Sequence, residues 1–255
     1  TRWLAQARPA RVLWPWENMP WERDLVRRAR ALGIPTVGYL HTPFGPHHIL
    51  ISAHANADGA ASLPDAIVCT GAAPRDALIA FGHERERLIV GGSLRAVVFQ
   101  PLRRDARGPV FFGLPNIAPI AREMVAAAEA LAAKGWPVQV RRHPMMPPGE
   151  VPVPARLLTD RPLTQQDGLS AVVYAMSSIG LEATGGGLPV VRFRSESMFA
   201  QIAVLPDDRD VPATNAAGLE PVLKNLAAAA PFDAGRYFAV PDLAFWDRLV
   251  VDPIG

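Results

Sequence analysis

Two short motifs in the second half of the chain place residues that can bind phosphate directly after predicted strands. The apolar run SAVVYAM (170–176) is followed by Ser177 and Ser178, which open a predicted helix over 178–184. Backbone N–H groups at a helix start, the helix dipole and a serine hydroxyl together form an anion-binding site. Glu182 lies one turn further along the same face and could accept hydrogen bonds from ribose hydroxyls. The structural alternative is that one serine caps the helix and Glu182 complements its dipole.

The second motif is RRHP, Arg141 to Pro144, at the end of a strand predicted over 137–144. His143, held in place by the following proline, is able to donate a hydrogen bond to a phosphate oxygen. Arg141 and Arg142 point to opposite faces of the strand, so at most one of them joins the site. The structural alternative is a surface turn with solvated arginines. Because ligands of parallel sheets bind at the carboxyl ends of the strands, we expect this motif and the serine motif to act together.

Glu17 is the candidate general base of the first half. It follows a strand predicted over 11–16 and is flanked by Trp14, Trp16 and Trp21. Partial desolvation by these rings would raise the proton affinity of the carboxylate toward that of a useful base. The alternative is an ordinary solvent-exposed glutamate.

Glu22 and His41 are further polar residues on the same predicted side. Glu22 lies in the first turn of a helix predicted over 21–33, where acidic side chains favour the N-terminus for structural reasons alone. His41 follows the strand predicted over 35–40. It is interpreted as part of a loop that contacts an acceptor, with an ordinary loop histidine as the alternative.

No set of residues has the spacing of a metal site. His41, His47 and His48 lack the paired helical spacing and the companion carboxylate that a zinc site needs. Asp208 and Asp210 form a DxD string, a pattern that can hold a metal-bound diphosphate, but their acidic loop is interpreted as solvated surface. We therefore expect neither a metal ion nor a cofactor.

These residues follow short apolar runs that alternate with helical segments, an order that indicates parallel sheets covered on both faces. The polar, basic segment QPLRRDARGP (100–109) interrupts the alternation and is predicted to be a linker. The sequence therefore predicts an α/β fold of two Rossmann-like halves facing a cleft, with domains at 1–99 and 110–255. Strands are predicted at 11–16, 35–40, 65–70, 87–92, 109–115, 137–144, 155–160, 170–176 and 188–193; helices at 21–33, 74–82, 120–134, 162–168, 178–184, 216–230 and 243–250; and a loop, with a helix as an option, at 42–63.

Composition excludes several classes of protein. The chain has 255 residues, of which 49% are hydrophobic, and a formal net charge of +2, which is too balanced for a dedicated nucleic-acid binder. A single cysteine excludes an internal disulfide framework, and no apolar run reaches the roughly 18 residues of a membrane span. The phosphate loop of P-loop NTPases, the GxGxxG dinucleotide fingerprint and the GxSxG elbow of hydrolases are all missing from the sequence.

The chain resembles bacterial GT-B-type glycosyltransferases that make surface polysaccharides. The resemblance is closest to capsule and O-antigen enzymes that share an HP motif and an SS motif with bacterial sialyltransferases and Kdo transferases. Arg142-His143-Pro144 resembles the HP motif, and Ser177-Ser178 with the trailing LEATGGGLPVVRF resembles the SS motif. The segment ENMPWERDLVRRARALGIPTVGYLHTPF (17–44) resembles the acceptor-side segment of that family. Members are usually longer than this chain, so an N-terminal portion of the first half is expected to be missing or reduced.

The resemblance implies a role for each candidate residue. The second half would bind the nucleotide sugar, with His143 and the serines at the phosphate and Glu182 near the ribose. The first half would be the acceptor side, with Glu17 facing the acceptor. The expected site residues are Glu17 and His143 as catalytic residues, Arg142, His143, Ser177, Ser178 and Glu182 as nucleotide-binding residues, and Glu22 and His41 on the acceptor side.

The sequence and the resemblance together predict a metal-independent glycosyltransferase that moves a sugar from a nucleotide-activated donor to a bacterial surface-glycan acceptor. The HP and SS motifs of the resemblance favour a CMP-linked acidic sugar, such as a sialic acid or Kdo, and Arg192 and Arg194 would suit its carboxylate. The alternatives are a UDP-sugar epimerase or polyol-phosphate transferase of related fold, and a non-catalytic nucleotide-sugar-binding protein. The expected partners are the donor and a glycan or lipid-linked glycan acceptor, with no nucleic acid. The expected location is the cytoplasm, with peripheral contact at the inner face of the cytoplasmic membrane.

Overall fold

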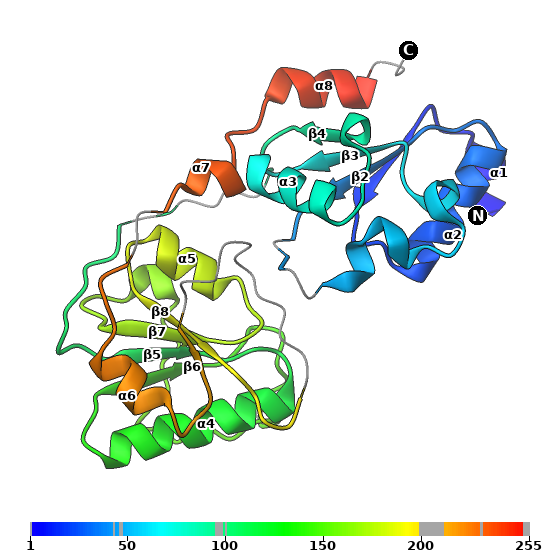
Figure 1. The fold of residues 1–255 in the computed structure, drawn as a ribbon. Coiled ribbons are helices and arrows are strands. Elements are labelled where there is room, and N and C mark those ends of the chain that lie inside the picture. The colour runs from blue at the N-terminus through cyan, green and yellow to red at the C-terminus, as the bar shows by residue number, and fades with distance from the viewer. Residues whose placement is uncertain are drawn as a thin grey trace. The chain divides into compact units, whose positions relative to one another are not determined.

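The computed structural model describes residues 2–42, 44–45, 48–94, 99, 101–198, 212–229 and 232–251. The chain forms two compact α/β units (Figure 1). Unit 1 comprises Thr1–Val97 together with Asp233–Gly255, and unit 2 comprises Val98–Phe232. The C-terminal segment therefore belongs to unit 1, which corrects the prediction that residues 110–255 form one domain. The structure confirms the two parallel-sheet halves of Rossmann type that the strand–helix alternation predicted.

Unit 1 contains a four-stranded sheet in the order β1-β2-β3-β4, and every neighbouring pair is parallel. Each strand follows from a short apolar run bounded by polar or turn-forming residues. Between β2 and β3 the described residues of the predicted loop form three short 3₁₀ turns, η1 (Ile49–Ile51), η2 (Ala53–Ala55) and η3 (Gly59–Ser62), rather than an α-helix. The strands are β1 (Val12–Pro15), β2 (Thr36–Leu40), β3 (Ala66–Cys69) and β4 (Leu88–Val90).

Helices cover both faces of the unit 1 sheet. One face packs against α1 (Arg2–Ala7), α2 (Pro20–Ala31) and α3 (Ala72–Ala80) through a core that includes Trp16 and Leu78. The other face packs against α8 (Leu243–Val251), whose Trp246 and Leu249 contact Val37, Tyr39 and Val68. The remaining short elements of the unit are the 3₁₀ turn η4 (Arg85–Arg87) and α7 (Ala234–Tyr237).

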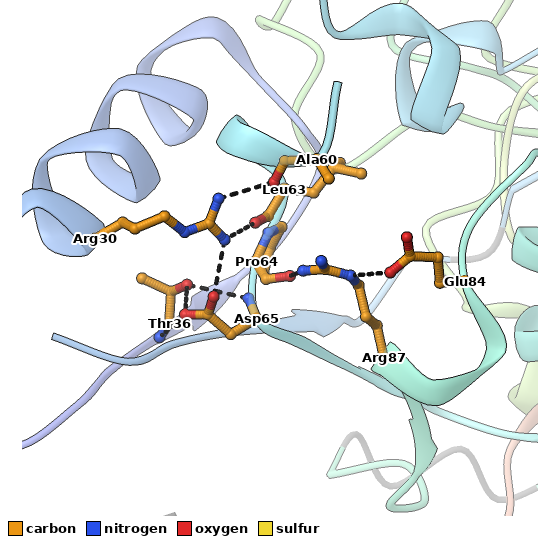
Figure 2. A network of polar contacts seen from close by, with 8 residues as sticks. All are labelled: Arg30, Thr36, Ala60, Leu63, Pro64, Asp65, Glu84 and Arg87. Carbon is orange, nitrogen blue, oxygen red and sulfur yellow. Dashed lines mark hydrogen bonds and ion pairs between the residues drawn. The ribbon is translucent and has the colours of Figure 1, made fainter. Parts of the chain in front are cut away.

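A polar network ties the amino ends of the strands in unit 1 to their neighbours (Figure 2). The carboxylate of Asp65, just before β3, accepts hydrogen bonds from the backbone N–H and hydroxyl of Thr36, at 2.9 and 2.7 Å, and from Arg30 at 2.8 Å. Arg30 also donates to the carbonyls of Ala60 and Leu63, at 2.9 and 3.1 Å. These contacts hold the amino ends of the strands, whereas Glu17 and His41 follow the carboxyl ends of β1 and β2.

Unit 2 contains a five-stranded parallel sheet in the order β6-β5-β7-β8-β9. The segment 155–160, predicted as a strand, makes only an isolated bridge between Val140 and Leu158, because it runs through a turn rather than along the sheet. The strands are β5 (Val110–Gly113), β6 (Val138–Arg141), β7 (Ala171–Tyr174), β8 (Val190–Phe193) and β9 (Ala213–Thr214).

Helices again lie on both faces of the unit 2 sheet (Figure 1). The long helix α4 (Ala118–Ala133) packs on one face together with α6 (Leu219–Lys224), around Phe112, Val173 and Phe193. The other face carries α5 (Ile179–Gly185), over a smaller core. The helix predicted over 216–230 is thus shorter in the structure, and the one predicted over 162–168 is the 3₁₀ turn η5 (Leu163–Gln165).

Within the described ranges, no helix combines the length and the apolar character needed to cross a lipid bilayer.

Candidate functional site

The topology of unit 2 selects one edge of its sheet for ligand binding. When the five strands are numbered by their order in the chain, they lie side by side in the sheet as 2-1-3-4-5. The chain therefore passes from β5 to β6 on one side and then crosses to β7 on the other side of β5. Ligands of open parallel sheets bind outside the carboxyl ends of the strands, at the point where the winding reverses. In this unit that point lies between the carboxyl ends of β5 and β7. Asn116 follows β5, and Ser177 follows β7.

Strand register brings the two sequence motifs to this edge. Gly113, the last residue of β5, pairs with Arg141 of β6 on one side and with Tyr174 of β7 on the other. His143 lies two residues beyond Arg141, and Ser177 lies three residues beyond Tyr174. Strands β6 and β7 are separated by two strand spacings, about 10 Å. The motifs therefore lie on one edge of one sheet, as expected, while their binding of a phosphate stays a prediction.

Gly113 also lets α5 begin close to the end of β5. A Cβ atom added at this position would lie 2.8 Å from Cδ1 and Cγ2 of Ile179, the first residue of α5. A larger residue at 113 would push the helix, and the serines before it, away from the sheet. The start of α5 is thus set by a glycine on the neighbouring strand.

His143 is held as a neutral hydrogen-bond donor. Its Nδ1 atom accepts a hydrogen bond from the backbone N–H of Met145 at 3.2 Å, so in the neutral ring the proton lies on Nε2. Burial, together with the charge of Arg141, lowers the pKa of His143 below its ordinary value of 6.5. The ring is therefore neutral at pH 7, with an N–H group to offer to a ligand. Arg142 lies beside it, with its buried Nε lacking a hydrogen-bond partner among the described residues.

The two serines differ in their surroundings. Ser178 precedes α5 but does not cap it, because its hydroxyl donates instead to Oε1 of Glu182 at 3.2 Å. The hydroxyl of Ser177 is buried and has no partner among the described residues. Since buried polar groups are nearly always hydrogen-bonded, this orphan hydroxyl indicates a missing partner. The helix has only seven residues, so the predicted anion site depends on side chains rather than on a long helix dipole.

In unit 1 the structure brings Glu17 and His41 together. They follow the neighbouring strands β1 and β2, and the Nε2 atom of His41 lies 3.8 Å from Oε1 of Glu17. The hydroxyl of Thr42 lies between them, 2.9 Å from the histidine nitrogen and 3.4 Å from the carboxylate oxygen. Thr42 was not predicted from the sequence, because an isolated threonine after a histidine carries no signal of its own.

The tryptophan shell predicted around Glu17 does not form. Trp16 is buried in the core and Trp21 is 59% exposed, because successive residues at the strand end and the helix start point in different directions. The side chain of Glu17 is 46% exposed. Its carboxylate is thus open to an acceptor, but it is not desolvated by these rings as the sequence analysis expected.

Glu22 is buried and has a structural role, which differs from the acceptor contact that the resemblance implied. Its carboxylate accepts hydrogen bonds from the backbone N–H groups of Glu17 and Met19, at 3.0 and 3.2 Å, as the acidic member of a capping box. Burial raises the pKa of Glu22 above its ordinary value, against the opposing effect of these hydrogen bonds. Glu22 therefore positions the loop that carries Glu17.

Other histidines and acidic residues named from the sequence do not add to a metal site in the described part of the chain. There, no three His, Cys, Asp or Glu residues are grouped as metal ligands. Burial lowers the pKa of His48, against the opposing effect of the charge on Glu17. His47, Asp208 and Asp210 lie outside the described residues.

Glu123 is a residue that the sequence analysis missed. It lies in α4, and its carboxylate accepts hydrogen bonds from the backbone N–H groups of Glu196 and Ser197, at 2.8 and 3.1 Å. It also accepts from the hydroxyls of Ser195, at 2.8 Å, and of Ser197. Burial favours the protonated form, but these hydrogen bonds hold the pKa of Glu123 below its ordinary value. Its partners are more than 70 positions away in the chain, so helical spacing gave no sign of them.

Comparisons with known proteins identify the fold but no family. No protein-family model matches the chain, and no curated protein matches its sequence. Among solved structures, the UDP-GlcNAc 2-epimerase of Methanocaldococcus jannaschii, in complex with UDP-GlcNAc and UDP, is 10% identical with a TM-score of 0.55. The match covers 92% of this chain and 75% of that one.

Two further structures are similar at a TM-score of 0.47 and 13% identity. One is the lipopolysaccharide outer core galactosyltransferase WaaB, where the match covers 99% of this chain and 78% of that one. The other is the UDP-GlcNAc 2-epimerase of Rickettsia bellii, where it covers 76% of this chain and 58% of that one. The present chain thus spans little more than half the length of the Rickettsia enzyme.

At these identities the similarity shows the fold alone. The chain has two parallel-sheet α/β halves of the Rossmann type, as in the GT-B fold. The predicted cleft between the halves stays a prediction.

Proposed function

We propose that this protein is a glycosyltransferase that moves a sugar from a nucleotide-activated donor to a bacterial surface-glycan acceptor. The observation that carries the proposal is that His143 and Ser177 follow strands of one sheet at the same edge, beside the topological switch point of unit 2. One offers a neutral N–H donor and the other a buried, unpartnered hydroxyl among the described residues. Both are donors suited to the phosphate of a nucleotide sugar.

These donors would assist departure of the nucleotide. As the glycosidic bond to the phosphate breaks, negative charge develops on the phosphate oxygens. A hydrogen bond from Nε2 of His143 and one from Ser177 would stabilise that charge, without a metal ion in this step. Glu182, tied to Ser178, would accept a hydrogen bond from the ribose with its remaining lone pairs. Activity that persists in EDTA is expected, and its loss would contradict the metal-independent step.

Glu17 would act on the acceptor in an inverting reaction. Its exposed carboxylate would take the proton of the attacking hydroxyl, while Glu22 holds the loop and Thr42 donates to the same carboxylate. His41, 3.8 Å away, would line the acceptor side. The proposed acceptor is a glycan or a lipid-linked glycan. The exposed Met19 and Trp21, two and four residues after Glu17, suit contact with a lipid anchor or a membrane surface.

A CMP-linked acidic sugar is the proposed donor. The HP and SS motifs of the sequence favour it, and so do the arginines at the end of β8. A nucleotide sugar of some kind is supported by the structure of the Methanocaldococcus enzyme, which contains UDP-GlcNAc and UDP. That enzyme binds a uridine nucleotide, so titration with CMP, UDP and GDP decides the base of the donor nucleotide.

A UDP-sugar 2-epimerase is the second candidate, favoured by the TM-score of 0.55 to the Methanocaldococcus enzyme. Incubation with UDP-GlcNAc or with CMP-sialic acid, each in the presence of a glycan acceptor, and analysis of the products by mass spectrometry and NMR separates the two activities. An epimer of unchanged mass identifies an epimerase, whereas release of free nucleotide with a heavier acceptor identifies a transferase. With a CDP-polyol as the donor, the same analysis detects polyol-phosphate transfer. Nucleotide binding without any product indicates a binding protein.

Calorimetric titration with CMP, UDP and GDP tests the nucleotide site. We expect one of them to bind, and we expect His143→Ala to weaken its binding by about 10- to 100-fold, the effect of losing a hydrogen bond to a charged group. Arg161→Ala is the matched control, because Arg161 is exposed in the same unit and its side chain has no recorded contact within the described residues. Failure of all three nucleotides to bind a folded sample would refute the proposal.

A further inference from the structure

A polar pocket of about 290 Å³ opens at the carboxyl ends of β8 and β9. We propose that it is the subsite for the carboxylate-bearing sugar of the donor, with Arg194 as the residue that binds the carboxylate. This inference rests on the proposed function, because it extends the nucleotide site along the same sheet edge. The pocket is lined by Arg194, Ser195, Glu196, Thr214 and Asn215.

The pocket lies next to the proposed phosphate site. Strand β8 pairs directly with β7, with Arg192 opposite Tyr174, so Ser195 is level with Ser177. Neighbouring strands are about 4.8 Å apart, and three such spacings, about 14 Å, separate β6 with His143 from β8 with Arg194. A span of this size suits one nucleotide sugar that reaches from the histidine across the serines to the arginine.

Side-chain alternation places Arg194 on the appropriate face of the sheet. Val191 and Phe193 of β8 belong to the core beneath α4, so Arg192 and Arg194 extend from the opposite face. That face carries α5, which follows Ser177 and Ser178. Arg194 and the serine motif are therefore on the same face of the same edge.

The charges in the pocket favour a carboxylate with neighbouring hydroxyl groups. The structure records no ion pair for the Arg194 side chain within the described part of the chain, and the exposed guanidinium has the planar donor fork that matches a carboxylate. Glu196 accepts a hydrogen bond from Nδ2 of Asn215 at Oε1 and could accept sugar hydroxyls at Oε2. Glu196 would repel a doubly charged phosphate about twice as strongly as a singly charged carboxylate at the same distance.

The pocket wall is held in place before any ligand arrives. Glu123 binds the backbone of Glu196 and Ser197 and both serine hydroxyls, and the Asn215–Glu196 hydrogen bond of 2.6 Å joins the two sides of the pocket. The backbone N–H of Arg194 donates to the carbonyl of Thr214 at 2.8 Å. Arg194 thus extends from a fixed strand end, which reduces the entropy lost when it binds a ligand.

Ligand pairs with and without the sugar carboxylate test the assignment. Calorimetry compares UDP-glucuronate with UDP-glucose, which differ in one carboxylate, and CMP-sialic acid with CMP, which differ in the whole acidic sugar. Each pair is measured on the wild type, on Arg194→Gln and on the control Arg161→Gln. One of the two pairs carries the nucleotide that the protein binds. Within that pair, we expect the wild type and the control to bind the acidic member with about tenfold or more higher affinity. Arg194→Gln should abolish that preference and leave the affinity for the bare nucleotide unchanged.

Two results would overturn the inference. One is a preference for the acidic donor that survives in Arg194→Gln. The other is an equal loss of affinity for the acidic donor and for the bare nucleotide, which would place Arg194 at the nucleotide instead. If no nucleotide binds, the proposed function fails, and the pocket is judged by NMR with free glucuronate and glucose. A shift of the Asn215 amide with glucuronate alone would support the subsite, and no shift would refute it.

Discussion

His143 shows how a single side chain is prepared for an anion. The Met145 N–H occupies Nδ1, and burial with the nearby Arg141 keeps the ring neutral, so the available group is an N–H donor. A positively charged ring would attract phosphate more strongly, but it would also have to break the hydrogen bond at Nδ1. The hydrogen bond from Met145 thus fixes the orientation of the ring, and with it the direction of the Nε2–H donor, before a ligand binds.

Nucleotide binding should raise the pKa of His143. A phosphate beside Nε2 favours the charged ring, so the pKa must rise from its lowered value in the free protein, and affinity must increase as the pH falls through that range. Titration of the histidine Cε1 proton by NMR, with and without the nucleotide, measures the change. His83 is the internal control, because it is buried in unit 1 with Nε2 2.7 Å from the carbonyl of Ile51. An unchanged pKa for His143 would place the phosphate elsewhere.

His83 also predicts how stability depends on pH. Burial lowers its pKa below 6.5, against the raising effect of the hydrogen bond to Ile51. The unfolded chain therefore binds more protons than the folded chain below that pH, so the free energy of unfolding should fall as the pH drops from 7 toward 5. Urea denaturation across this range measures the slope, and His83→Gln should make it shallower. A slope that is the same in the variant would contradict this assignment.

At the scale of elements, α5 is positioned by two glycines, one within the helix and one on strand β5. A Cβ atom at Gly180 would lie 2.5 Å from Cε2 and Cζ of Tyr174, and one at Gly113 would meet Ile179. Gly180→Ala should therefore lower the free energy of unfolding by about 1–3 kcal/mol, as overpacking does, and should also weaken nucleotide binding through displaced serines. Denaturant unfolding and calorimetry measure the two effects. A fully stable variant with unchanged affinity would show that α5 is not held in this way.

The loop after β8 is positioned by α4 through one carboxylate. Glu123→Gln removes the charge that draws in two backbone N–H groups, so the amides of Glu196 and Ser197 should exchange with solvent faster than in the wild type. Hydrogen exchange followed by NMR measures this directly. Because the pKa of Glu123 is lowered, its stabilising contribution is present above the unfolded value of 4.5 and is lost as the pH falls through the folded value. Unchanged exchange rates would mean that the loop is held by other contacts.

Strands were easier to predict than the elements between them. Val172 and Val173, or Phe111 and Phe112, lie in short apolar runs whose burial on both faces is visible in the sequence. The segment 155–160 has a similar run, but it turns after one bridge to β6, which only tertiary packing decides. Glu22 illustrates the limit for the site, since its spacing indicates a helix start but not that its carboxylate binds the Glu17 loop.

At the scale of the molecule, unit 1 is completed by the end of the chain. Trp246 of α8 packs edge-on against Tyr39, with ring centroids 5.2 Å apart, and donates from Nε1 to the carbonyl of Gly91 at 2.8 Å. Sequence order suggested that residues after 110 form one domain, because periodicity within α8 does not reveal which sheet it covers. Only the structure shows that residues 233–255 belong to unit 1.

Trp246→Ala should therefore destabilise unit 1 without altering the nucleotide site. The free energy of unfolding should fall by about 3–5 kcal/mol, the usual cost of truncating a large buried aromatic residue. Affinity for the nucleotide, measured well below the unfolding temperature, should stay at the wild-type value. A loss of affinity in the folded variant would show that unit 2 does not form the nucleotide site by itself.

The most direct test of the proposed nucleotide site is a crystal structure of the protein with the nucleotide that binds in calorimetry. The phosphate is predicted to lie within hydrogen-bonding distance of Nε2 of His143 and of the Ser177 hydroxyl, outside the carboxyl ends of β5 and β7. Density for the nucleotide on unit 1, or at another edge of the unit 2 sheet, would contradict the account.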